Sequence, residues 1–208
     1  MSYQRRFALL ALAAGVAVAG CQKNPLVVRR TGCPAVAIPT YAGDVTLFRP
    51  GTTQDAGNLD VVATITNVRE TCTEAVDALA TSVTYDVLAR RTSAAGARTE
   101  TLPVFATMVQ GGNLIVSKQI GAVSVSFADG QLRAVGRGGA QARVARSATR
   151  LPDEIQAKLD KKRKAGDIDA ATDPMADPQV RAAVRAASFE MLIGFQLGEA
   201  ALAYNVTK

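Results

Sequence analysis

Cys21 is the residue whose type and surroundings point most directly to chemistry. It follows Val18, Ala19 and Gly20, and small residues of this kind fit the narrow cleft of a signal peptidase. The thiol directly after such a cut is the group that receives diacylglycerol in bacterial lipoproteins. We therefore predict cleavage between Gly20 and Cys21, with a lipidated Cys21 at the start of the mature protein.

The segment before Cys21 supports a lipoprotein signal peptide over residues 1–20. Arg5 and Arg6 precede an apolar run that ends at Ala19, which is the order of a secretory signal. The alternatives are an ordinary signal peptide with a chance cysteine and an N-terminal membrane anchor. The apolar run of about thirteen residues is shorter than the roughly 20 residues that a spanning helix needs. The lipoprotein signal is therefore the favoured interpretation.

The residues after Cys21 predict where the protein resides. Gln22, rather than an aspartate, follows the cysteine, which resembles the outer-membrane class of bacterial lipoproteins. Residues 21–34 are polar and basic with two prolines, and we expect them to form a lipidated tether. The predicted location is the periplasmic face of the outer membrane, reached through the lipid anchor.

Cys33 and Cys72 are the thiols that remain once Cys21 is acylated. In an oxidising periplasm, two thiols most simply form one disulfide. A bridge closing a loop of about 40 residues is expected to contribute roughly 4 kcal/mol of stability. The alternative is two free, buried cysteines. The spacing is wrong for a redox pair, and two thiols without histidine make a poor metal site.

Other chemistry has little support in this chain. There is no histidine, which removes the commonest general base and nearly all catalytic zinc sites. Gly136, Gly138 and Gly139 lie inside a strand pattern, where they indicate a bulge or bend rather than a phosphate loop. Carboxylate pairs that are distant in sequence stay open as a catalytic alternative. We expect no catalysis, no cofactor and no metal site.

The charge of the chain favours some partners over others. The net charge is +6, a mild excess that is compatible with contact to anionic lipid or lipopolysaccharide. Nucleic acid is not an expected partner of an envelope protein. A group of arginines lies along the predicted strand at 131–146 and just after it, and it is either a basic stripe or a charged, solvated strand edge. Its members are Arg133, Arg137, Arg143, Arg146 and Arg150.

Residues 35–150 carry the alternation of strands. Val123, Val125 and Phe127 alternate with small polar or small apolar residues, so that one face is buried and the other is solvated. Similar patterns predict strands at 44–48, 61–66, 83–89, 99–109, 113–118, 123–127 and 131–146. About seven strands separated by glycine-rich turns favour an immunoglobulin-like or fibronectin-like antiparallel β-sandwich. A small barrel is the alternative.

The period changes in residues 151–208, which predict a two-helix segment packed on the sandwich. Pro152 and the acids after it indicate a first helix that ends before Gly166. Asp177 is placed to cap a second helix over residues 178–197, which has apolar residues at steps of three and four. Alternation at Leu202, Tyr204 and Val206 predicts a final strand.

Two stretches of the chain resemble an uncharacterised family of proteobacterial envelope lipoproteins. They are CPAVAIPTYAGDVTLFRPG, from Cys33 to Gly51, and KAGDIDAATDPMADPQVRAAVRAASFEMLIGFQ, from Lys164 to Gln196. The resemblance implies a lipoprotein signal and a domain without assigned residue roles. We expect a lipid-anchored periplasmic interaction or structural component that binds other envelope proteins. The alternative is a binding module for lipid or another apolar ligand, with its site between the sandwich and the 178–197 helix.

Overall fold

A computed structural model describes residues 31–207 of the chain. Gly20, Cys21, the signal peptide 1–20 and most of the tether 21–34 lie outside the described residues. The chain divides into two compact units, and the second of these, Gly32–Lys208, contains the strands and helices described below.

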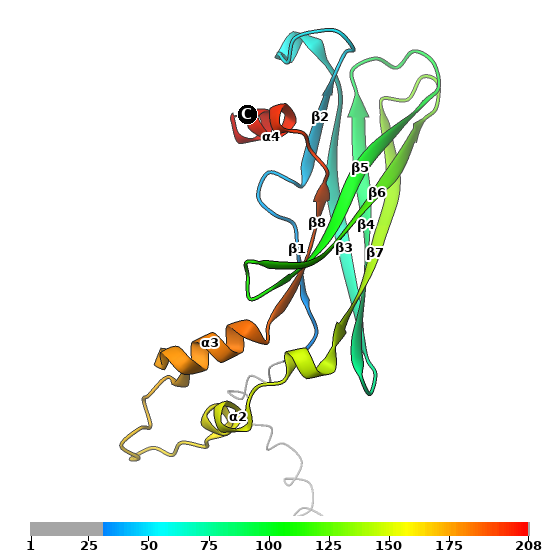
Figure 1. Cartoon of the computed structure of the whole chain (residues 1–208). Helices are drawn as coiled ribbons and strands as arrows, with labels where there is room; N and C mark the ends of the chain where they lie inside the picture. Colours follow the sequence, from blue (N-terminus) through cyan, green and yellow to red (C-terminus); the bar gives the residue numbers. More distant parts are fainter. Residues whose placement is uncertain (1–30, 208) are drawn as a thin grey trace, which may run out of the picture. The chain divides into compact units, whose positions relative to one another are not determined.

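The second unit is a sandwich of two four-stranded sheets (Figure 1). The first sheet has the order β1-β8-β5-β6, formed by Ala35–Ala37, Phe189–Phe195, Arg98–Gln110 and Leu114–Phe127. The second has the order β2-β3-β4-β7, formed by Asp44–Phe48, Leu59–Glu74, Ala78–Arg91 and Arg133–Ala145. All pairings are antiparallel except that of β1 with β8. The prediction of a mainly β fold with antiparallel-rich sheets is confirmed.

Alternating side chains build the core between the sheets. Along β4, Val83, Tyr85 and Val87 are buried, whereas Thr84 and Leu88 are exposed. Strands β5, β6 and β8 contribute the facing layer, with Leu102, Val125 and Ile193 each fully buried. This period-two burial is the pattern expected of sheets with one solvated face.

Three α-helices and three short 3-10 helices complete the described part of the chain. The α-helices are α2 (Asp153–Asp160), α3 (Pro178–Ala186) and α4 (Glu199–Thr207), and the 3-10 helices are η1 (Ala56–Asn58), η2 (Arg146–Thr149) and η3 (Pro174–Ala176). α2 and α3 lie near one end of the sandwich, and α4 lies beside β2 (Figure 1). The predicted first helix is confirmed as α2.

The predicted helix over residues 178–197 is wrong beyond Ala186. The chain turns at Ala187 and Ser188 and enters β8, which lies between β1 and β5 in the first sheet. Phe189, Met191 and Ile193 point to the core at a period of two. Glu190 is exposed and Leu192 is half-buried between these core residues, but an apolar run this short is ambiguous between a helix and a strand. The sandwich therefore does not end at residue 150, as predicted, because β8 of the C-terminal segment is one of its strands.

The predicted final strand at 202–206 is also wrong, because these residues belong to α4. The Asn205 side chain is buried, and its Nδ2 donates to the carbonyls of Tyr41 (2.9 Å) and Asp44 (2.8 Å). Tyr204 packs edge-on against Phe48, with ring centroids 5.0 Å apart. These contacts attach α4 to both ends of β2 and to Tyr41 just before it. They join residues far apart in the sequence, so the alternation of residues 202–206 could not reveal them.

Candidate functional site

The disulfide predicted between Cys33 and Cys72 is confirmed. Cys33 precedes β1, and Cys72 lies near the C-terminal end of β3. The bridge therefore ties the entry of the sandwich to the far end of a strand in the other sheet. It closes a sequence separation of 39 residues, and this constraint on the unfolded chain stabilises the fold.

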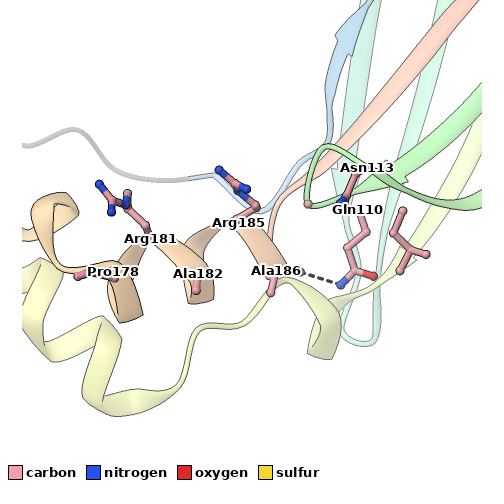
Figure 2. A pocket seen from close by; sticks show the side chains of 9 residues that line it. Gln110, Asn113, Pro178, Arg181, Ala182, Arg185 and Ala186 are labelled. Atoms are coloured by element: carbon pink, nitrogen blue, oxygen red, sulfur yellow. Dashed lines mark hydrogen bonds between the residues drawn. The ribbon is translucent and has the colours of Figure 1, made fainter.

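A surface groove of about 500 Å³ lies between α3 and the turn that joins β5 to β6 (Figure 2). It is lined by Gln110, Gly111, Asn113, Leu114, Pro178, Arg181, Ala182, Arg185 and Ala186. The turn uses Gly111 and Gly112 at φ values of 65° and 80°, a conformation that glycine adopts without strain. Part of this groove corresponds to the ligand site expected beside the second helix, now bounded by the shorter α3.

Specific hydrogen bonds hold the two walls of the groove together. Asp177 caps α3 by accepting from the Gln179 backbone N–H at 2.8 Å, as predicted from the sequence. At the other end of α3, Gln110 Nε2 donates to the Ala186 carbonyl at 2.7 Å (Figure 2). The Gly111 N–H also donates to the Ser188 carbonyl at 3.0 Å. The hairpin therefore satisfies carbonyls that the end of the helix leaves open.

The groove is positively charged along α3. Arg181 and Arg185 are spaced four residues apart and project from the same side of the helix (Figure 2). Among residues 31–207, neither of them forms an ion pair. An adjoining hollow of about 460 Å³ shares Arg185 and is also lined by Glu190. This arrangement can bind an anionic group next to an alanine surface.

An exposed apolar segment begins where the groove meets β6. Leu114, Ile115 and Val116 are 57%, 63% and 46% exposed, and we call these three residues the apolar hairpin end. They lie on β6, which is the edge strand of the first sheet. Exposed apolar residues on a strand edge usually mark a binding surface or an aggregation hazard. The exposure of these residues was not predicted, although the apolar run directly after Gly111-Gly112-Asn113 is its signal in the sequence.

The structure separates the arginines that the sequence grouped. Arg133, Arg137 and Arg143 share the outer, exposed face of β7. Arg146 instead donates to Glu74 at 2.9 Å and to the Ala75 carbonyl at 2.8 Å. Arg150 lies beyond the strand. Three of the five arginines therefore form a stripe on an edge strand. The basic stripe and the charged strand edge considered from the sequence are thus the same feature.

Among the described residues, the carboxylates with a shifted pKa are not part of the groove lining, although Asp177 directly precedes the lining residue Pro178. Hydrogen bonds from Lys158 and Lys161 lower the pKa of Asp177 and Asp169, respectively. A hydrogen bond from Thr53 lowers the pKa of Asp55. A lowered pKa keeps a carboxyl ionised, which is the opposite of what a general acid needs at neutral pH.

Residues 31–207 show neither a metal-ligand cluster nor a helix suited to span a membrane. No group of three or more His, Cys, Asp or Glu side chains is arranged to hold a metal ion. None of the helices in this part of the chain has the length and hydropathy required to cross a membrane.

Compared with protein-family models, curated proteins and solved structures, the chain matches none of them.

Proposed function

We propose that the protein is a lipid-anchored periplasmic interaction component of the bacterial outer membrane, without catalytic activity. The Val18-Ala19-Gly20-Cys21 motif supports the anchor, and the bridge between Cys33 and Cys72 fits an oxidising compartment. The carboxylates with lowered pKa sit in capping and ion-pair roles, which fits a binding protein better than an acid–base enzyme.

The observation that carries the interaction role is the apolar hairpin end. Its three side chains are about half exposed or more on an edge strand, and they lie beside the groove at Leu114. Water contact with such a cluster is unfavourable, and burying it against another protein would recover about 25 cal/mol per Å². The partner we propose is another envelope protein that covers this end of β6.

In-cell photocrosslinking tests the partner. A photoreactive residue at Ile115 should give a discrete higher-mass adduct in the envelope fraction. The matched control is Thr101, which is exposed on the neighbouring strand β5. The absence of any adduct from positions 114, 115 and 116, in cells where the protein is present at the membrane, would contradict the interaction role.

The anchor needs its own test. The Cys21→Ala variant should lose fatty-acid labelling and leave the membrane fraction after mild salt extraction. A variant that stays membrane-bound and labelled by fatty acid would show that Cys21 is not the anchor.

A second candidate is binding of an apolar or lipid-like ligand in the groove beside α3. The groove combines Ala182 and Ala186 with Arg181 and Arg185, which suits an amphiphile with an acidic head group. Ala182→Trp would fill the groove without touching the core, because Ala182 is exposed. A fluorescent fatty acid should then bind the natural chain and not the variant, and equal binding to both would exclude this site.

We also propose that the fold is immunoglobulin-like or fibronectin-like. Two packed sheets support it. The strand order supports it less, because lettering the strands by sequence gives BCDG and AHEF, whereas the constant-type immunoglobulin order is ABED and CFG.

A further inference from the structure

The outer face of the second sheet gathers arginines from three adjacent strands. The β3–β4–β7 register places their side chains on the solvated side, opposite the core. We call this surface the arginine face, and its arginines are Arg69, Arg90, Arg133, Arg137 and Arg143. The acids on the same face are Asp44 and Asp86, and the charge of the face is therefore clearly positive.

Two arginines of this face oppose each other directly. Arg90 of β4 pairs in register with Arg133 of β7, and both are exposed. Side chains in this relation start about 5 Å apart, and like charges there repel. Among the described residues, neither arginine has an ion-pair partner, whereas Arg137 pairs with Asp86 at 3.7 Å. Two facing guanidinium groups make a site for an anion that would relieve their repulsion.

Exposed apolar side chains lie in the adjoining positions of the face. Leu88 and Val135 are paired in the next row of the β4–β7 ladder and are 50% and 59% exposed. Val62 of β3 pairs with Arg90 and is 38% exposed. The face thus combines a shallow apolar centre with arginines whose long stems can lie along it while their head groups reach phosphate.

We propose that the arginine face docks onto an anionic lipid bilayer surface. Charge complementarity selects this occupant: planar guanidinium groups bind lipid phosphates, and the apolar centre enters the head-group region. This contact goes beyond the lipid anchor and does not depend on Cys21. An acidic protein partner on the same face is a different outcome, and the experiment below separates the two.

The chain contains no tryptophan, and a single introduced tryptophan therefore reports its own surroundings. The full chain carrying Leu88→Trp is mixed with vesicles of brominated phosphatidylcholine, with or without phosphatidylglycerol. We expect fluorescence quenching only when phosphatidylglycerol is present, and its loss at high salt. The control is Ile120→Trp, because Ile120 is 59% exposed on the other sheet, and it should stay unquenched in both vesicles.

Reversing the charge of Arg90 tests whether the arginines contribute to lipid binding. Adding Arg90→Glu to the Leu88→Trp chain should weaken binding to the anionic vesicles about 25-fold, on the order of fivefold for the lost charge and again for the repulsive one. The same change replaces a like-charge pair by an opposite one facing Arg133, and urea unfolding should show no loss of stability. A folded variant with weaker lipid binding supports the proposal.

Several results would overturn it. Equal quenching in zwitterionic and anionic vesicles, or equal quenching from Ile120→Trp, would show that the arginine face is not the contact. Absence of quenching in anionic vesicles would exclude lipid, and crosslinking of this face to an acidic protein would then assign it to that partner. Repeating the experiment with Cys21→Ala separates this contact from the anchor, since quenching should persist there.

Discussion

Tyr85 and Gly138 lie directly opposite each other in the β4–β7 ladder, and the Tyr85 ring occupies the space where a side chain on residue 138 would begin. A Cβ on Gly138 would lie 2.7 Å from Tyr85 Oη. Burial of the ring raises the pKa of the Tyr85 phenol. The glycine thus lets a large aromatic ring lie flat against the neighbouring strand within the core.

Gly138→Ala should therefore destabilise the protein by about 1 to 3 kcal/mol, the usual cost of overpacking a core. The measurement is urea unfolding. Gly121→Ala is the matched control, because its Cβ would be 3.7 Å from the nearest atom, Val104 Cγ2, and it should be nearly neutral.

A double-mutant cycle assigns the cause. Once Tyr85→Ala has removed the ring, adding Gly138→Ala should cost much less than it does in the natural chain. An equal cost in both backgrounds would mean that the ring is not what the glycine accommodates.

Arg91 is an arginine inside the core without a carboxylate. It is 1% exposed, and its guanidinium donates to the carbonyls of Gln131 and Gly96 at 2.7 Å, and to those of Ala94 and Ala128 at 2.8 and 3.0 Å. Its Cζ lies 5.2 Å from the centroid of the Phe127 ring. One side chain therefore joins the β4–β5 turn to the β6–β7 turn.

Arg91→Met should cost about 3 to 5 kcal/mol, because four carbonyl contacts are lost at once and a shape-matched apolar chain cannot replace them. Arg91→Lys should also be strongly destabilising, since an ammonium lacks the planar fork. The control is the neighbouring, exposed Arg90→Met, which should change the free energy of unfolding by less than about 0.5 kcal/mol. Similar losses of unfolding free energy at both positions would show that the carbonyl contacts of Arg91 do not stabilise the fold.

Sequence patterns located the early strands, most clearly β4, in which buried and exposed residues alternate, whereas Val45 and Thr46 of β2 are both buried. The predicted strand at 44–48 matches β2, and alternation along β4 locates its buried residues. The same period extends to Arg91, whose burial could have been predicted from position alone. The glycines of β7 were expected to mark a bulge or bend, but the pairing of β7 with β4 is regular. Gly138 instead gives room to the Tyr85 ring, whereas a Cβ on Gly136 would meet Val123 and Val125 of the other sheet.

Two C-terminal elements, β8 and α4, could not be predicted, because distant parts of the chain determine them. β8 alternates buried residues with the exposed Glu190 and the half-buried Leu192, but it is short and follows the helical pattern of α3 directly, so that its apolar residues also fit a longer helix. α4 depends on the carbonyls of Tyr41 and Asp44, more than 150 residues away in sequence. The groove likewise exists only where Gln110 meets Ala186. The cysteine pair was predictable because elimination left only two thiols.

The disulfide yields a quantitative prediction. Reducing the bridge, or replacing Cys33 and Cys72 together by alanine, should lower the free energy of unfolding by about 4 kcal/mol. Reductant should have no further effect on the double variant. Peptide mapping after alkylation of the denatured, unreduced protein provides the check: labelling of both Cys33 and Cys72 would show that the bridge is not formed.

The ionisation of Asp177 should determine how the α2–α3 region responds to acid. Its carboxylate accepts from Lys158 Nζ at 2.9 Å and from the Gln179 N–H at 2.8 Å, and these contacts hold its pKa below the ordinary 3.8. A lowered folded-state pKa contributes stability that is fully present above the unfolded value and is lost as the pH falls from 3.8 through the folded value. The protection of α3 amides, which is their exchange rate relative to an unfolded chain at the same pH, should therefore fall in acid before the protection of the β4 core does.

Substitution separates the two roles of Asp177. Asp177→Asn keeps a capping side chain but removes the charge, and it should make the protection of α3 amides nearly independent of pH in that window while leaving the helix formed at neutral pH. Asp177→Ala should loosen α3 at every pH, because the cap is lost as well. If Asp177→Asn leaves the acid response of α3 unchanged, another carboxylate controls it. Asp169, which is paired with Lys161 at 2.6 Å and also has a lowered pKa, would be the next residue to substitute.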